Sequence, residues 1–511
     1  MTMTTNGLYL PKMELDELFH LPEKCRIAAF AGAQLLLYRH NPCLHDYFLP
    51  LQLYFGRPGA ANIPQQSFSR RALSLASRQA HAVIRPLSRR KYKADVLYCP
   101  MPNFQRRKEN RFLIRTLLGL AQTDATILCL LPQDAPCREE IMALLKAEGR
   151  CGQVTLLDPE ALLTPISTRL FSFAAHVRGR SAFAEISQIL QPFGCNPPRE
   201  AQSSFEHLAR FVEAWTSIEE FVEFDAVVSR CHWQALCSPV CRTAQRRGKP
   251  IITFQQGVID HTLDVPVIAS RYVAFGRSSA TFLERMNRSF FKALGSVEPS
   301  VDFVPGGSLY DTVLELPNQF EKRTLLLIDE PDPNGFYGLD IQGRGVLRLA
   351  EKLLHSKVPR HVIIRPHPYM TDVDLEPWKQ LVRDYPDLCE LSHSTWTIED
   401  DLKRVSAVVG NFSGTLTLAA ASGLPTFFLR ADGYEIGDLA CFRRGQTFQP
   451  EDAFPEISRV LTDPDAYAEA RAVALANARE YYAEGRNMDL NGAFFSRMLS
   501  RGPVSASILL N

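Results

Sequence analysis

Short apolar runs alternate along this chain with longer stretches whose apolar residues recur at helical spacing. In the first part the short runs have the length and composition of buried strands, and they cover residues 95–98, 126–131, 153–157, 225–229, 250–254, 271–275 and 301–304. The helical stretches cover residues 110–121, 138–147, 205–221 and 278–294. This alternation predicts a parallel sheet with helices on its faces.

The same alternation starts again further along the chain. Predicted strands at 324–329, 361–364, 406–410 and 425–429 alternate with predicted helices at 345–354 and 398–404. A helix is also predicted at 24–38, and the chain from residue 450 onward is helical. Its long surface helix at 468–483 is expected to pack back across the first domain. Two successive units of this kind predict an α/β fold with two Rossmann-like domains facing a cleft.

These elements divide the chain into four parts. We expect a basic N-terminal extension at 1–94 packed on the first domain, a first Rossmann-like domain at 95–305, a second at 306–450, and a helical tail at 451–511. A chain of 511 residues is long enough for two to four domains with ample cores.

The predicted strand at 361–364 ends in the turn Arg365-Pro366-His367-Pro368. Two prolines restrict the backbone around His367, which a surface histidine does not require. The turn therefore indicates that a cation and an imidazole are held at the carboxyl end of a strand.

A second turn follows the predicted strand at 406–410. Ser413 is placed to cap a helix of small and aliphatic residues that begins with Gly414 and Thr415, and Gly423 is placed to end it. The first N–H groups of such a helix, its dipole and the two hydroxyls suit a phosphate. A capped helix after a strand is common in α/β proteins, so the alternative is an ordinary cap. The nearby Arg365 and His367 favour the anion site.

A third turn, Gln255-Gln256-Gly257, follows the predicted strand at 250–254. The glycine lets the backbone turn sharply at the edge of the sheet. Gln255 and Gln256 can hydrogen-bond a sugar, and Asp260 and His261 can move protons. The alternative is a polar loop that covers a strand end.

Composition narrows the choice of partners. A hydrophobic content of 46% and a charged content of 22% are ordinary for a globular protein, and the net charge of +1 argues against general nucleic-acid binding. The first twelve residues lack a basic region followed by an apolar core, and no run reaches the length of a membrane span. We expect a cytoplasmic protein.

The cysteines fit that compartment. Most of the twelve lie in apolar surroundings and are interpreted as small core residues. The one cluster, Cys231-His232 with Cys237 and Cys241, lacks a paired Cys-x-x-Cys spacing, so a helix with Cys237 and Cys241 on one face is favoured over a zinc site.

One segment departs from the neutral balance of the chain. Between Asp46 and Asp95 no residue is acidic, whereas basic residues recur from Arg57 to Lys93. Such a segment can lie on an anionic membrane surface or hold a polyanionic acceptor. Alternatively, the folded body supplies its counter-charges.

Together these turns resemble those of bacterial glycosyltransferases of the GT-B fold that build capsules, lipopolysaccharide and teichoic acids. That group includes capsule-type Kdo transferases, polysialyltransferases and CDP-glycerol glycerophosphotransferases. The resemblance covers residues 225–430 and rests on the order and spacing of four turns: Gln255-Gln256-Gly257, Gly307-Ser308-Leu309-Tyr310-Asp311, Arg365-Pro366-His367-Pro368, and Asn411-Phe412-Ser413-Gly414-Thr415 with Gly423-Leu424-Pro425.

The resemblance implies that the first domain holds a glycan or lipid-linked acceptor and the second a nucleotide-activated sugar, as substrate and without a further cofactor. It implies that the nucleotide is CMP and that the sugar is Kdo or another acidic keto-sugar. The donor nucleotide-binding residues so implied or predicted are Arg365, His367, Pro368, Ser413, Gly414, Thr415, Gly307 and Ser308.

The sequence departs from the family pattern in two places. Gln256 stands where the relatives have a histidine or an acid, and Leu309 replaces the usual Pro-Arg. A non-catalytic polysaccharide-assembly protein on the same fold is therefore an alternative, as is a CDP-glycerol-type glycerophosphotransferase. Residues 410–414, Gly-Asn-Phe-Ser-Gly, also resemble the Gly-x-Ser-x-Gly pattern of serine hydrolases, but the serine comes one position later. A serine hydrolase is therefore a further alternative.

Glycosyl transfer needs a base for the acceptor hydroxyl and positive charge at the leaving phosphate. Our candidate bases are Asp260, then Glu330 at the end of the predicted strand 324–329, then His261. Gln256 is expected to orient the sugar. Arg365, His367 and the helix after Ser413 are expected to stabilise the phosphate without a metal ion.

Overall fold

The structure is a computed structural model of the 511-residue chain. It describes residues 26–40, 44, 91–100, 107–133, 135, 137–158, 165–191, 201–233, 237–255, 265–307, 312–329, 344–367, 370, 372–393, 396–410, 413–429, 447–448, 450–482 and 488–500.

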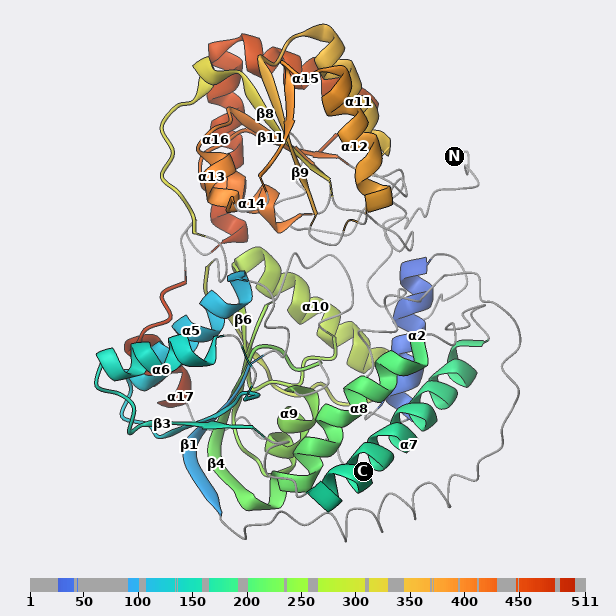
Figure 1. Ribbon diagram of the computed structural model, residues 1–511, viewed down its shortest axis with the longest axis vertical. Coiled ribbons are helices and arrows are strands. Elements are labelled where there is room, and N and C mark those ends of the chain that lie inside the picture. Colours follow the sequence, from blue (N-terminus) through green and yellow to red (C-terminus); the bar gives the residue numbers. More distant parts are fainter. Residues whose placement is uncertain are drawn as a thin grey trace.

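The first domain is built on a seven-stranded parallel sheet with the order β3-β2-β1-β4-β5-β6-β7 (Figure 1). Its strands are β1 (Tyr92–Cys99), β2 (Ile127–Leu130), β3 (Val154–Leu157), β4 (Val222–Ser229), β5 (Ile251–Phe254), β6 (Arg271–Ala274) and β7 (Asp302–Pro305). Most strand residues are buried, as expected of a sheet covered on both faces.

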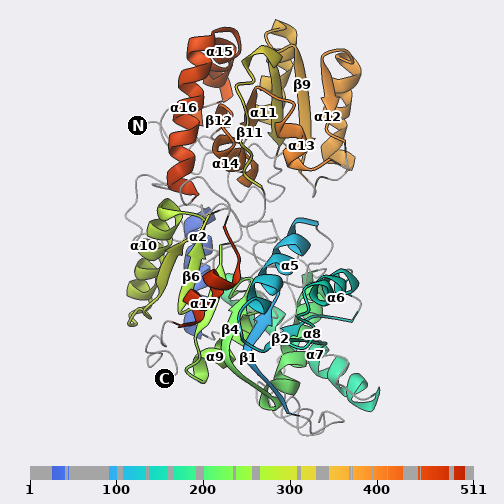
Figure 2. The ribbon, with the colours of Figure 1, turned by 90° about the vertical axis from the view of Figure 1, so that its left-hand side faces the viewer.

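Helices cover this sheet on both sides. They are α5 (Arg107–Ala121), α6 (Arg138–Ala147), α7 (Pro165–Leu190), α8 (Ala201–Ile218), α9 (Cys237–Arg246) and α10 (Arg277–Leu294). α5 and α6 lie on one side of the sheet, and α8, α9 and α10 lie on the other (Figures 1 and 2). α2 (Arg26–His40) packs on α7 and α10. The basic segment from Arg57 to Lys93 lies outside the described residues, apart from its last three residues, of which Lys91 precedes β1 and Lys93 lies within it.

The second domain is built on a six-stranded parallel sheet with the order β10-β9-β8-β11-β12-β13. Its strands are β8 (Thr324–Asp329), β9 (His361–Pro366), β10 (Cys389–Leu391), β11 (Ala407–Gly410), β12 (Thr426–Leu429) and β13 (Thr447–Phe448). The helices are α11 (Arg344–Ser356), α12 (Asp372–Asp384), α13 (Ile398–Leu402), α14 (Gly414–Ala421) and α15 (Pro450–Thr462).

Both sheets share one connectivity. In each, the first strand lies at the centre, the second and third follow on one side, and the fourth begins the other side. This order is that of a doubly wound Rossmann-type sheet, in which ligands bind at the carboxyl ends of the strands where the order reverses. The predicted α/β architecture with two Rossmann-like domains is confirmed.

The C-terminal region does not form a separate unit. α15 contributes Ala453, Ile457 and Val460 to the core of the second domain. α16 (Pro464–Tyr481) packs mainly along α14 and reaches α10 of the first domain only toward its end (Figure 2). The long helix expected to pack across the first domain is therefore present, but most of it lies on the second domain, because it packs mainly on α14 and α15.

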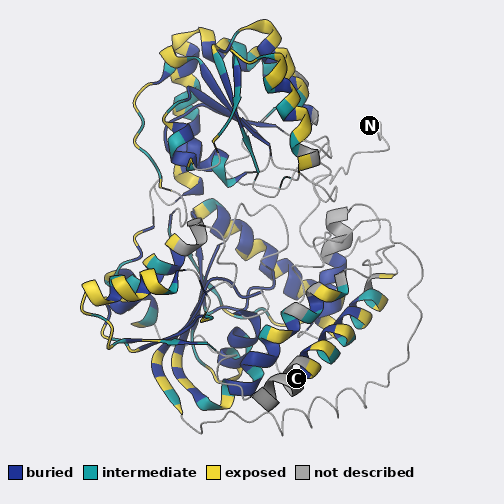
Figure 3. Cartoon of the chain, viewed as in Figure 1, coloured by how far each residue is buried: buried dark blue, intermediate teal, exposed yellow. Residues whose placement is uncertain are grey.

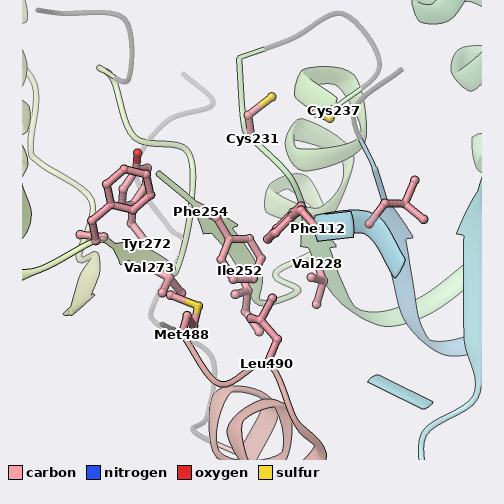
Figure 4. Close-up of a cluster of buried hydrophobic side chains, with 14 of the residues drawn as sticks. Phe112, Val228, Cys231, Cys237, Ile252, Phe254, Tyr272, Val273, Met488 and Leu490 are labelled. Atoms are coloured by element: carbon pink, nitrogen blue, oxygen red, sulfur yellow. The ribbon is translucent and has the colours of Figure 1, made fainter. Parts of the chain in front are cut away.

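The last described helix lies on the first domain. α17 (Gly492–Ser500) packs on α5, and Met488 and Leu490 before it enter the core beside Ile252, Phe254 and Val273 (Figure 4). Arg115 on α5 donates a 2.6 Å hydrogen bond to the Met488 carbonyl. Figure 3 shows that most strand residues of both sheets are buried and that exposed residues follow the outer faces of the helices.

Candidate functional site at the carboxyl edges of the two sheets

The carboxyl edges of the two sheets are turned toward each other. α5 begins after the carboxyl end of β1, and its Arg111 lies 3.8 Å from the carboxylate of Glu399, at the start of α13 in the second domain. The same carboxylate accepts a 3.1 Å hydrogen bond from the Thr312 N–H in the segment that joins the domains. A ligand held at one edge would therefore face the other.

At the second edge, β8 and β11 mark the point where the strand order reverses. Gly410 ends β11 beside Ile328, and a Cβ on Gly410 would come within 2.6 Å of the Ile328 carbonyl oxygen. Only glycine allows so close an approach here. It lets the end of β11 lie directly against the end of β8.

The helix α14 opens at this point. Ser413 has an extended backbone, φ −127° and ψ 134°, and its hydroxyl accepts a 3.3 Å hydrogen bond from the Thr415 N–H. Ser413 is buried, whereas Gly414 and Thr415 are half-buried. The predicted N-cap is therefore present. The extended backbone of Ser413 also differs from the strained turn that exposes a hydrolase nucleophile.

Arg365 is at the end of β9, but its guanidinium is turned toward α13. It forms an ion pair with the fully buried Asp401 and hydrogen bonds to the Ser392 hydroxyl at 3.2 Å and the Trp396 carbonyl at 3.3 Å. Ser392 in turn donates to Asp401 at 2.7 Å. Much of the charge of Arg365 is thus balanced inside the domain, and its role toward a phosphate stays a prediction.

His367 follows β9 directly and is half-buried. Its carbonyl accepts a 3.0 Å hydrogen bond from the Met370 N–H, which closes a tight turn after the strand. β9 and β11 lie on opposite sides of β8, so this turn and the start of α14 follow strand ends that are separated by one strand of the sheet. Pro368 lies outside the described residues.

Gln255 at the first edge has a structural role. Its side chain is fully buried; its amide oxygen accepts from the Phe275 N–H at 2.7 Å, and its amide nitrogen lies 3.5 Å from the Tyr481 hydroxyl. These contacts fasten β5 to β6 and to the end of α16. Both polar atoms of its side chain thus have partners within the protein. The predicted hydrogen bond from Gln255 to a sugar stays a prediction.

Gly307 also lies at the first edge. Its φ of +105° lies in a region that favours glycine, and its N–H donates to the Phe275 carbonyl at 2.7 Å. It ends the first domain, and its predicted contact with the nucleotide is untested.

Several predicted site residues lie outside the described residues. These are Gln256, Gly257, Asp260, His261, Ser308 and Glu330. Their roles in catalysis and in substrate binding stay predictions.

The structure adds two features that the sequence analysis missed. Asp329, at the end of β8, is fully buried and accepts a 2.9 Å hydrogen bond from the Trp378 indole of α12. Tyr482, just after α16, lies 2.8 Å from the hydroxyl of Thr417 in α14. Neither contact has a local sequence signal, because the partners are 49 and 65 residues apart.

The cysteine cluster lies in the core of the first domain. α9 carries Cys237 and Cys241 as predicted, both fully buried, and the Cys237 sulfur lies 3.7 Å from that of Cys99. Burial raises the pKa of the Cys99 and Cys241 thiols. Among the described residues, no three or more His, Cys, Asp or Glu side chains gather in a way that could hold a metal ion.

Two Asp-x-Asp sequences are present, at Asp372-Val373-Asp374 and Asp463-Pro464-Asp465. Asp372 is 95% exposed and pairs with Lys379 at 3.1 Å. Asp463 caps α16 by accepting from the Asp465 and Ala466 N–H groups. The first is a solvent-exposed helix start and the second a helix cap.

The protein thus has two doubly wound sheets whose carboxyl edges face each other. A C-terminal helix, α16, runs from the second domain back to the first. The fold is GT-B-like. In the part of the chain that the structure covers, we find no helix with the length and apolar character to cross a membrane.

No protein-family model matches the sequence, and no curated protein matches it. Solved structures with a similar fold include Anabaena Alr3699/HepE in complex with UDP and glucose, with 12% identity over 80% of this chain and 99% of that chain, at a TM-score of 0.44. S. aureus TarM in complex with Fondaparinux, alpha-GlcNAc-glycerol and UDP has 11% identity over 80% and 100%, at 0.45.

A putative UDP-N-acetylglucosamine 2-epimerase from Listeria monocytogenes has 15% identity over 81% of this chain and 98% of that chain, at a TM-score of 0.45.

Proposed function

We propose that this protein is a glycosyltransferase of surface-polysaccharide biosynthesis, of capsule or lipopolysaccharide, which transfers a sugar from a nucleotide donor to a glycan or glycolipid acceptor. The observation that carries the proposal is the second carboxyl edge, where α14 opens with Ser413, Gly414 and Thr415 and faces the first domain. A helix start with small, half-buried residues suits a phosphate, and the facing domain leaves the acceptor a place opposite it.

The donor nucleotide in this proposal is CMP. The four turns that resemble capsule-type enzymes support it, with His367, Ser413 and Thr415 near the phosphate. Calorimetric titration with CMP, CDP and UDP tests the assignment. A preference for UDP, which is bound in the HepE and TarM structures, would keep a glycosyltransferase and discard the CMP donor. Failure of all three to bind would discard the nucleotide site.

The donor sugar in this proposal is an acidic keto-sugar, Kdo before sialic acid. The basic residues from Arg57 to Lys93 suit an anionic ligand, and the family resemblance supports the same class. Incubating the purified protein with CMP-sugars generated in situ, and measuring CMP release with a glycolipid acceptor, tests it. Strong turnover of a neutral UDP-sugar would contradict it, and turnover of CDP-glycerol would identify the glycerophosphotransferase.

The transfer step needs a base and a stabilised leaving group. We assign the base to Asp260, with Glu330 and His261 as second and third choices, and the leaving phosphate to His367 and the start of α14. Gln256 has no group that accepts a proton at neutral pH, so we assign it to orienting the sugar. In this scheme no metal ion is needed, because the imidazole of His367 and the dipole of α14 stabilise the negative charge of the leaving phosphate.

A non-catalytic assembly protein is the second candidate. The burial of Gln255 favours it, because the first edge then offers one polar group fewer to an acceptor. Nucleotide binding without turnover of any donor in the panel would support this candidate over the enzyme.

We further propose that the segment from Arg57 to Lys93 attaches the protein reversibly to the inner face of the cytoplasmic membrane, since the acceptor we propose is lipid-linked. Each Lys or Arg near an anionic surface contributes about 1 kcal/mol, and salt screens the attraction. Sedimentation with phosphatidylglycerol-containing vesicles at low and high salt tests it. Absence of binding at low salt would rule the attachment out.

A further inference from the structure

A pair of tyrosines lies where the chain leaves the second domain. Tyr481 ends α16 and Tyr482 follows it, and both are buried. Their rings contact each other at 5.2 Å between centroids, and Phe275, at the end of β6, contacts Tyr482 at 5.5 Å and Tyr481 at 6.0 Å. The pair therefore packs on the carboxyl edge of the first sheet.

Two further contacts anchor Tyr481 to the first domain. The Tyr481 hydroxyl lies 3.5 Å from the Gln255 amide nitrogen, and Gln255 accepts from the Phe275 N–H. The Tyr481 carbonyl passes so close to Gly276 that a Cβ there would come within 2.2 Å of its oxygen. Because Tyr481 has little room to shift, its contacts with β5, β6 and the start of α10 fix the position of the adjacent Tyr482.

The Tyr482 hydroxyl reaches the other way, into the second domain. Thr417 donates its hydroxyl proton to the Gly414 carbonyl at 2.7 Å, so at 2.8 Å the Tyr482 hydroxyl is the donor to Thr417. The chain of bonds runs from Tyr482 through Thr417 to Gly414, the first residue of α14. Because Thr417 is almost fully buried, water does not replace this contact.

We propose that Tyr482 is a positioning residue for the donor phosphate: through Thr417 it orients the first turn of α14, where the N–H groups of Gly414 and Thr415 begin the helix. The proposal rests on the proposed function, since it needs a phosphate at α14. It makes the phosphate site of the second domain depend on a side chain that the first domain holds.

The matched control is Tyr467. It is fully buried in the second domain, and its hydroxyl also donates a hydrogen bond, to the Ser406 carbonyl at 3.0 Å. Ser406 precedes β11 at the opposite, amino end of the sheet. Tyr467→Phe therefore removes a comparable bond without reaching α14.

Calorimetric titration of Tyr482→Phe and Tyr467→Phe with CMP and with cytidine, which lacks the phosphate, tests the proposal. We expect Tyr482→Phe to weaken CMP binding about three- to tenfold and to leave cytidine binding unchanged. Tyr467→Phe should bind both like the wild type. Thr417→Val should weaken CMP binding at least as much as Tyr482→Phe does, whereas Thr417→Ser, which keeps the hydroxyl, should bind CMP like the wild type. The double variant Tyr482→Phe/Thr417→Val should bind CMP as weakly as Thr417→Val alone, because both changes break the same chain of hydrogen bonds.

Hydrogen exchange without ligand gives a second readout. Tyr482→Phe should speed exchange of the amides at residues 414–418, and Tyr467→Phe should not. Equal CMP affinities for the two Phe variants, or equal losses of CMP and cytidine binding in Tyr482→Phe, would overturn the positioning role while leaving the proposed function intact. A wild-type protein that binds no nucleotide would overturn the proposed function and this inference with it.

Discussion

The two sheets have the same strand order but differ at their carboxyl edges. At the ends of β5, β6 and β7 in the first sheet the protein's own chain occupies the space: Gln255 is fully buried, Gly276 lies against the Tyr481 carbonyl, and a Cβ on Gly306 would come within 1.9 Å of the Met488 side chain. At the second edge Gly414 and Thr415 remain half-buried. A Rossmann-type sheet thus provides a carboxyl edge at which a ligand can bind. Whether that edge is open to a ligand depends on where the rest of the chain packs.

Glycines mark this difference. Gly276 and Gly306 allow the C-terminal crossing segment, by which we mean residues 480–482 and Met488, to pack against the first sheet. Gly410 brings β11 close to β8, and Gly414 opens α14. In the first domain the two glycines make room for the C-terminal crossing segment. In the second domain the start of α14 is half-buried.

The largest effect is expected from the base that we assign to the loop after β5. Asp260→Asn should lower turnover by about 10²- to 10⁴-fold, because a general base typically contributes that much. CMP affinity should stay unchanged, since the phosphate is assigned to the other edge. Turnover close to the wild-type rate would show that Asp260 is not the base, and Glu330→Gln would be the next variant to measure.

The packed character of the first edge predicts a cost for adding a methyl group. Gly276→Ala should lower the free energy of unfolding by about 1–3 kcal/mol, as overpacking does, because the new Cβ meets backbone atoms of Tyr481. Gly152→Ala is the control, because a Cβ on Gly152 would have no atom within 4 Å. Denaturant unfolding measures both, and equal stabilities would mean that the crossing segment does not pack on Gly276 as described.

The ligand-accepting character of the second edge predicts a selective loss of binding. Ser413→Ala and Asp463→Ala each remove an N-cap, which costs about 1 kcal/mol of stability. Ser413→Ala alone should also weaken CMP binding, about tenfold, since it removes a hydroxyl assigned to the phosphate. Titration calorimetry separates the two variants, and unchanged CMP affinity in Ser413→Ala would move the phosphate away from α14.

The smallest effect is expected where the two edges meet. Arg111→Ala should change the free energy of unfolding by less than about 1 kcal/mol, because Arg111 is half-exposed and such pairs are weak. Its effect should appear in small-angle scattering as a larger radius of gyration at low salt. Arg288→Ala, which breaks an exposed pair with Glu284 inside α10, should leave the radius unchanged. Equal scattering from both variants would argue that Arg111 and Glu399 do not hold the edges together.

The sequence predicts the strand ends well because each is a local event. Proline, glycine or a capping serine follows each of the apolar runs before Arg365, Gln255 and Ser413. In the structure β9 ends at Pro366, β5 ends at Phe254 and α14 begins at Gly414. Local periodicity and turn chemistry suffice for such features.

The partners of the site residues could not be predicted in this way. Arg365 suggests a free cation in the sequence, but Asp401, 36 residues away, balances its charge. Gln255 suggests an exposed polar group, but Phe275 and Tyr481 enclose it. These outcomes depend on which helix covers which face, and that is decided by tertiary packing.

Hydrogen exchange with and without saturating CMP tests the contrast between the two edges most directly. We expect protection of the amides at 413–418 and around 365–367, and none at 251–255 or 271–276, where the protein already fills the edge. Protection confined to the first edge, with residues 413–418 unchanged, would contradict the assignment of the nucleotide to the second domain.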